Sequence, residues 1–173
     1  TCYIYDDKLI TGSIERIKDI NIIPSPYLTG ALDQCFQLPL IPMLETTRGC
    51  PFTCTFCADG LSIKSKVNRY ESQRTREELQ LIAKNINKVD ELIVTDLNFG
   101  MYKQDMETAK EIANIQKNYN YPISVDAPAG KNMPKRIINI ASIMKGWSMG
   151  GAIQSSDPDV LKAIKRSNII IKN

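Results

Sequence analysis

The sequence predicts an α/β fold in which parallel strands alternate with helices. From residue 40 onward, four apolar runs of strand length are each followed by a longer segment with apolar residues at helical spacing. This alternation is typical of a β/α barrel or a doubly wound sheet, and both place their sites at the carboxyl ends of the strands. Because only four units are visible, we expect a partial parallel β/α barrel, with one sheet edge that needs cover from further sequence or another chain.

The first two units have clear beginnings. A strand is expected at residues 41–46, and its helix begins at a capping box formed by residues 75–78. The second unit pairs a strand at residues 91–95 with a helix that Asp105 is expected to cap.

The last two units follow the same order. A strand at residues 121–125 precedes a helix with Pro134 in its first turn, and a strand at residues 148–154 precedes a helix that begins at Asp157. The expected buried side of the third helix consists of Ile137, Ile138, Ala141 and Met144.

The first 37 residues carry no recognisable chemistry. Pro24 and Pro26 favour an extended segment that leads into a short helix at residues 28–36. We therefore divide the chain into a linker or tail from an upstream domain, residues 1–37, and the amino-terminal part of the barrel, residues 38–173.

Composition limits the function classes. With 173 residues, 43% of them hydrophobic, the chain has the content of one soluble domain. The net charge of +3 is too small to imply a membrane or nucleic-acid partner, and the basic run at residues 64–76 has no interleaved aromatic residue beyond Tyr70, so a nucleic-acid platform is weakly supported. The chain contains no histidine, which excludes a Ser-His-Asp triad and a His-ligated zinc enzyme. No secretory or membrane-spanning segment is visible, so we expect a cytoplasmic protein.

Three of the five cysteines, Cys50, Cys54 and Cys57, form a C-x3-C-x2-C motif in a loop that Gly49 and Pro51 open. Clustered cysteines in a chain that is not secreted favour metal binding over disulfides. Three thiolates are one short of a closed four-coordinate site. The motif therefore indicates an iron–sulfur cluster with one open iron, or a zinc site completed from elsewhere, for example by Asp59.

The motif resembles the signature of the radical S-adenosylmethionine (radical SAM) superfamily, C-x3-C-x-aromatic-C, with Phe56 as the aromatic residue. The resemblance implies an enzyme in which Cys50, Cys54 and Cys57 hold a 4Fe-4S cluster and the fourth iron chelates S-adenosylmethionine. It implies reductive cleavage to a 5'-deoxyadenosyl radical that attacks a small-molecule or unknown substrate. An electron donor such as flavodoxin or ferredoxin would then be a partner.

The same resemblance implies further contacts with S-adenosylmethionine. Phe56 would lie beside the adenine. Asp96 and Asn98 stand where the family carries a Gly-Gly-Glu type motif, and would accept protons of the ammonium group; an ordinary turn after a strand is the alternative. Gln154 and Ser155 stand where relatives contact the ribose or the carboxylate, with helix capping as the alternative for this segment.

Residues 23–33 resemble the segment that joins a cobalamin-binding domain to the radical domain in one subgroup of the family. This likeness implies an upstream domain, cobalamin bound outside the present chain, and a methyltransferase or a rearrangement of a small molecule. Two other classes stay open: a non-catalytic iron–sulfur electron carrier and a zinc-stabilised binding module.

Overall fold

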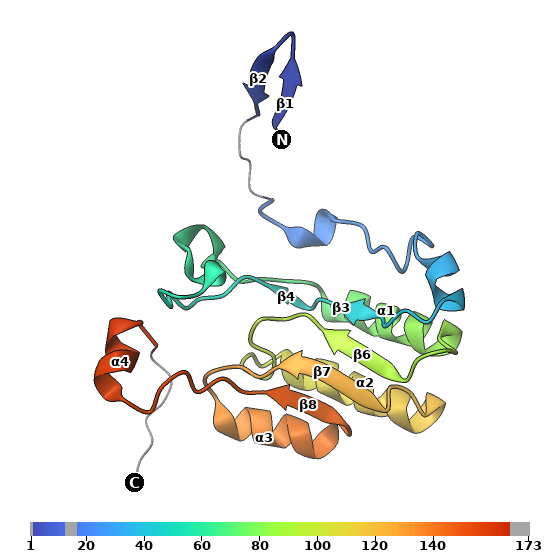
Figure 1. The fold of residues 1–173 in the computed structure, drawn as a ribbon. Helices are drawn as coiled ribbons and strands as arrows, with labels where there is room; N and C mark the ends of the chain where they lie inside the picture. Colours follow the sequence, from blue (N-terminus) through green and yellow to red (C-terminus); the bar gives the residue numbers. More distant parts are fainter. Residues whose placement is uncertain (1, 13–16, 167–173) are drawn as a thin grey trace.

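The computed structural model describes residues 2–12 and 17–166 (Figure 1). Its centre is a parallel sheet in the order β3-β6-β7-β8. The strands are β3 (Met43–Leu44), β6 (Glu91–Val94), β7 (Ser124–Pro128) and β8 (Trp147–Gly150). The order of these strands in the sheet is the same as their order along the chain, as in a barrel. A doubly wound sheet instead reverses its strand order at a switch point. The predicted partial parallel β/α barrel is confirmed.

Three helices cover one face of this sheet, α1 (Ser72–Asn85), α2 (Asp105–Tyr119) and α3 (Pro134–Ile143) (Figure 1). They pack side by side, α1 against α2 and α2 against α3. The sheet is apolar on the side that meets them, as the period of two along a strand requires. The core between the two layers includes Leu44, Leu79, Ile82, Leu92, Val94, Ile112, Val125, Ala127 and Ile140.

The cysteine loop belongs to the first crossover. It lies between two short antiparallel strands, β4 (Thr47–Arg48) and β5 (Asn68–Arg69), and contains the 3-10 turns η3 (Ala58–Gly60) and η4 (Ser62–Lys64). The short helix α4 (Pro158–Ala163) follows β8. In Figure 1 the cysteine loop and α4 lie at the same end of the sheet, beyond the carboxyl ends of the strands.

The amino-terminal residues form two separate parts. An antiparallel hairpin of β1 (Cys2–Tyr5) and β2 (Lys8–Thr11), which the sequence analysis did not predict, is exposed throughout. Nearer the sheet are two 3-10 turns, η1 (Ile20–Ile22) and η2 (Asp33–Gln37). The hydroxyl of Tyr27 donates to Met43 O at 2.9 Å, which connects this segment to β3, the first strand of the parallel sheet. The division of the chain at residue 37 stays a prediction.

Several predicted boundaries are wrong. The helix expected at residues 28–36 is the 3-10 turn η2 preceded by turns. Helix α1 begins at Ser72, one turn before the expected capping box, so Thr75 lies inside the helix with a buried hydroxyl. Asp105 is the first residue of α2 and follows its N-cap; its carboxylate accepts a hydrogen bond from Tyr102 N at 2.8 Å.

The later strands and α3 also differ from expectation. β7 begins at Ser124, after Pro122, which has no N–H to donate to a ladder, and β8 ends at Gly150. On α3, Ile137 and Ile140 form the buried stripe, and the C-cap residue Met144 is buried after it. The predicted Ile138 is 65% exposed and Ala141 is also exposed, since they lie outside that stripe. No helix within residues 2–12 and 17–166 is long and apolar enough to span a membrane.

Candidate cluster-binding site

Glycines let the cysteine loop fold closely on itself. Gly49 has a φ of +111°, and a Cβ there would lie 2.3 Å from Lys66 O. A Cβ on Gly60 would lie 2.3 Å from Cys54 O. Both distances are shorter than any real Cβ contact, so only glycine fits these positions. The amide of Cys50 also donates to Lys64 O at 3.0 Å, which closes the loop around its first cysteine.

The three cysteines of the motif differ in exposure. Cys50 and Cys54 are 4% and 3% exposed, and Cys57 is half-buried. Cys57 N donates to Cys54 O at 3.2 Å, so these two belong to one turn. Among the described residues, no three His, Cys, Asp or Glu side chains are arranged to hold a single metal ion. A 4Fe-4S cluster does not require that arrangement, since each cysteine binds a different iron.

Asp59, the proposed fourth ligand of the zinc alternative, has a partner within the loop. Asp59 forms an ion pair with Lys64, with 2.8 Å between Oδ1 and Nζ. Its carboxylate is therefore engaged within the loop.

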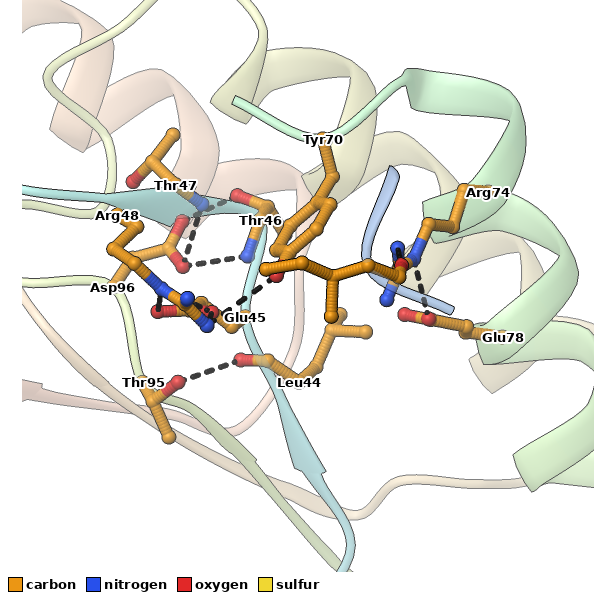
Figure 2. A network of polar contacts seen from close by, with 11 residues as sticks. Leu44, Glu45, Thr46, Thr47, Arg48, Tyr70, Arg74, Glu78, Thr95 and Asp96 are labelled. Atoms are coloured by element: carbon orange, nitrogen blue, oxygen red, sulfur yellow. Dashed lines mark hydrogen bonds and ion pairs between the residues drawn. The ribbon is translucent and has the colours of Figure 1, made fainter. Parts of the chain in front are cut away.

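Asp96 forms hydrogen bonds with the residues that precede the cysteine loop. Its carboxylate is completely buried and accepts hydrogen bonds from Thr46 N at 2.7 Å, from Thr47 N at 3.0 Å and from the Thr46 hydroxyl (Figure 2). Burial raises the pKa of this carboxyl, and the hydrogen bonds from Thr46 and Thr47 oppose that rise. These contacts fix the chain where it passes from β3 to β4, directly before the loop.

Asn98 lies against the first cysteine. Its side chain is 2% exposed, and Nδ2 donates to Cys50 Sγ at 3.4 Å. The amide oxygen, Oδ1, is also buried and has no hydrogen-bond partner within the described part of the chain. A buried acceptor without a donor is costly, so this atom fits a ligand that brings an N–H group beside Cys50. The ammonium of S-adenosylmethionine is such a group.

Lys131 contacts the second cysteine, a contact that the sequence analysis did not predict. Lys131 Nζ lies 3.4 Å from Cys54 Sγ and 4.8 Å from the ring centroid of Phe52. Lys131 follows β7, as Asn98 follows β6. The carboxyl ends of two neighbouring strands therefore each supply a nitrogen donor to a different cysteine sulfur.

The other predicted site residues lie apart from these contacts. Phe56 leaves 50% of its surface exposed. Gln154 is exposed and has a φ of +73°, and the hydroxyl of Ser155 accepts a hydrogen bond from Asp157 N at 3.1 Å. No hydrogen bond in the described structure joins Gln154 or Ser155 to the cysteine loop. That loop instead meets the end of α4, where Thr55 N donates to Ile164 O at 3.1 Å.

The basic run at residues 64–76 has partners within the chain. Arg74 pairs with Glu78 and Arg76 with Glu111, at 2.9 and 3.0 Å. The guanidinium of Arg69 stacks on the ring of Tyr102, with 4.4 Å to its centroid. Arg48, at the start of the loop, pairs with Glu45 (Figure 2).

Comparison with known proteins agrees with this geometry. The Radical SAM superfamily matches residues 44–170. The chain is 33% identical over 179 residues to the cobalamin-dependent radical SAM methyltransferase TokK of Streptomyces tokunonensis, across 96% of the chain and 26% of the relative. It is 34% identical over 162 residues to 2-(S-pantetheinyl)-carbapenam-3-carboxylate methyltransferase of Streptantibioticus cattleyicolor, across 87% of the chain and 23% of the relative. The chain thus spans about a quarter of the length of these relatives.

Solved structures show the same fold. The cobalamin-dependent S-adenosylmethionine radical enzyme OxsB, with aqua-cobalamin and S-adenosylmethionine bound, matches 95% of the chain and 25% of its own with a TM-score of 0.64 and 19% identity. The radical S-adenosylmethionine methyltransferase TsrM of Kitasatospora setae matches 72% of the chain and 23% of its own, with a TM-score of 0.57 and 14% identity. Because the family match covers most of the barrel units, the chain belongs to the Radical SAM superfamily, as the cysteine spacing predicted.

Proposed function

We propose that this chain is part of a cobalamin-dependent radical SAM methyltransferase, and that it holds a 4Fe-4S cluster through Cys50, Cys54 and Cys57. The observation that carries this proposal is the cysteine loop and, beside Cys50, Asn98, whose buried Oδ1 has no hydrogen-bond partner among residues 2–12 and 17–166. The two methyltransferase relatives support the reaction class. When bound, the reduced cluster supplies the electron that cleaves S-adenosylmethionine to methionine and a 5'-deoxyadenosyl radical.

The protein side chains orient the cofactor. Asn98 Oδ1 accepts a hydrogen bond from the ammonium of S-adenosylmethionine, because Asn98 Nδ2 already donates to Cys50 Sγ. Asp96 was predicted to share that role, but it is completely buried and already accepts three hydrogen bonds from Thr46 and Thr47. We therefore assign Asp96 to positioning the cysteine loop. The contribution that it makes to the site is indirect.

Three further residues complete the proposed cofactor contacts. Phe56 offers an exposed aromatic face to the adenine, on the same loop as the cysteines. Gln154 and Ser155 follow β8, so they lie after a strand end like Asn98, and they contact the ribose or the carboxylate.

The wider setting follows from the chemistry. Cysteines that bind a cluster must stay reduced, which fits a cytoplasmic protein with flavodoxin or ferredoxin as the electron donor. The substrate is a small molecule, and cobalamin binds through a domain outside the present chain.

Product analysis tests the proposal. The anaerobically reconstituted protein, with the proposed cobalamin-binding domain included, is incubated with S-adenosylmethionine labelled in its methyl group, hydroxocobalamin and a strong reductant, which reduces the cobalamin to the cob(I)alamin that accepts a methyl group. We expect 5'-deoxyadenosine and S-adenosylhomocysteine by mass spectrometry, since the first marks reductive cleavage and the second marks methyl donation.

The control without reductant should lose the 5'-deoxyadenosine. S-adenosylhomocysteine alone would contradict the radical half of the proposal. Neither product from a protein with an intact cluster would favour the electron-carrier alternative. One equivalent of zinc without sulfide would favour the zinc-stabilised module.

A further inference from the structure

We propose that Asn98 and Lys131 set the reduction potential of the cluster by donating hydrogen bonds to two of its cysteine sulfurs. Asn98 Nδ2 lies 3.4 Å from Cys50 Sγ, and Lys131 Nζ lies 3.4 Å from Cys54 Sγ. The inference rests on the proposed function, because it requires both cysteines to bind the cluster. It adds a role for Lys131 that the sequence motif does not indicate.

The two donors sit on loops that are fastened to each other. Phe99 N donates to Pro128 O at 3.0 Å, and Gly130 N donates to Phe99 O at 2.7 Å. This bridge pairs the residue after Asn98 with the loop that leads to Lys131. A Cβ at Gly130 would lie 2.7 Å from Met101 Cβ, so the loops approach as closely as glycine allows. The positions of the two nitrogen donors are therefore coupled.

The positive charge of Lys131 beside Cys54 Sγ is not neutralised by a carboxylate within the described residues. No carboxylate of the described residues lies within 4.0 Å of its ammonium, in contrast to Lys64, which pairs with Asp59. Phe52 holds the side chain over the loop through its ring face. Lys131 is also half-buried, so water screens its charge less than that of a surface lysine.

The direction of the effect follows from charge. One-electron reduction makes a cluster more negative, and hydrogen bonds to its sulfurs are among the features that set its potential. An N–H group or an ammonium beside a sulfur stabilises the reduced state more than the oxidised state. Both side chains therefore raise the potential, and a full positive charge raises it more than an amide dipole.

The test is a redox titration of the reconstituted holoprotein without S-adenosylmethionine, followed by electron paramagnetic resonance. In Lys131→Met we expect the equilibrium constant for reduction to fall about tenfold, a shift of about 59 mV to more negative potential for one electron. Lys131→Arg should retain most of the wild-type potential. Asn98→Leu should shift it in the same direction by less.

Lys117→Met is the matched control, because it removes an exposed lysine from the last turn of α2, at the opposite end of the sheet. Its potential should equal that of the wild type. Equal potentials for Lys131→Met and Lys117→Met, with the cluster intact, would overturn this inference alone. A wild-type protein that shows no 4Fe-4S signal would instead overturn the proposed function, and the inference with it.

Discussion

Val94 and Asp96 lie two residues apart at the end of β6, and both are completely buried. Val94 packs in the apolar core between the sheet and the helices. Asp96 is surrounded by donors and accepts three hydrogen bonds from Thr46 and Thr47 (Figure 2). Over these two residues, the buried side of the chain changes from apolar packing at the end of β6 to hydrogen bonding just after it.

The difference shows how the fold serves its site. An apolar contact is non-directional, so the core tolerates side chains of similar volume. A buried carboxylate requires particular donors in particular places, and it therefore fixes the chain that carries them. The strand bodies hold the sheet and helices together, whereas the strand ends specify the position of the cysteine loop.

The largest expected effect is at the loop itself. Cys54→Ala removes one of the three sulfurs that we propose to hold the cluster, and we expect loss of nearly all bound iron and acid-labile sulfide after reconstitution. Cys2→Ala is the matched control, because Cys2 is exposed on the β1–β2 hairpin and should leave both contents unchanged. An equal loss in both variants would contradict the assigned role of the loop.

The next effect compares the two buried positions directly. Asp96→Ala leaves the amides of Thr46 and Thr47 and one hydroxyl without an acceptor, which should lower the free energy of unfolding of the apoprotein by about 3–5 kcal/mol. Val94→Ala should cost about 2 kcal/mol, through lost packing alone. Urea denaturation of the wild type and both variants measures these changes in the free energy of unfolding.

Cluster retention sharpens the same comparison. Asp96→Ala should also release iron to a chelator faster than the wild type, whereas Val94→Ala should not. Asp96→Asn, which keeps one carbonyl acceptor, should lie between Asp96→Ala and the wild type. Equal release from all three variants would show that Asp96 does not position the loop.

A third effect concerns Asp105, which is 1% exposed and lies at the same end of the sheet. Burial raises its pKa from 3.8 to about 6; the backbone hydrogen bond from Tyr102 opposes the rise and the nearby Asp96 carboxylate adds to it. The folded state therefore binds this proton more tightly than the unfolded chain does.

Ionisation of Asp105 must then destabilise the folded state as the pH rises. Between about pH 4 and about pH 6, the wild type should lose about 3 kcal/mol of unfolding free energy relative to Asp105→Asn. Urea denaturation of the two proteins across this range measures the difference. A difference that stays constant with pH would show that the Asp105 pKa is not raised by folding.

The smallest effect is expected on the outer surface of the helices. Arg76 and Glu111 join α1 to α2 at 3.0 Å, but their side chains are 45% and 25% exposed. Arg76→Ala should cost less than about 1 kcal/mol, since solvent screens such pairs. Arg74→Ala should cost more, because Arg74 and Glu78 are only 16% and 6% exposed. The reverse order in thermal unfolding would contradict this ranking.

The sequence was sufficient for the features that depend on local pattern. Apolar periodicity predicted the four strand–helix units, because the same periodicity brings Leu92 and Val94 to the helices. The motif of Cys50, Cys54, Phe56 and Cys57 predicted the family through its resemblance to the radical SAM signature, and the family match over residues 44–170 confirms it. Element boundaries were less accurate. Helix α1 begins at Ser72, where its N-cap residue makes no side-chain hydrogen bond, so the sequence there carries no capping signal.

The sequence was not sufficient for contacts between distant residues. Asp96 and Thr46 are 50 positions apart, and Lys131 and Cys54 are 77 positions apart. Nothing near Asp96 in the sequence distinguishes an internal carboxylate from one that meets a ligand. The two adjacent threonines after a buried strand are a weak signal, since buried hydroxyls there need a partner.

The most direct test of the central claim is electron paramagnetic resonance of the anaerobically reconstituted, dithionite-reduced protein with and without S-adenosylmethionine. We predict a 4Fe-4S signal that changes when S-adenosylmethionine is added, because in the proposed site one iron has no cysteine ligand and Asn98 Oδ1 accepts a hydrogen bond from the ammonium beside it. A 4Fe-4S signal that is the same with and without S-adenosylmethionine would contradict an open iron that binds this cofactor.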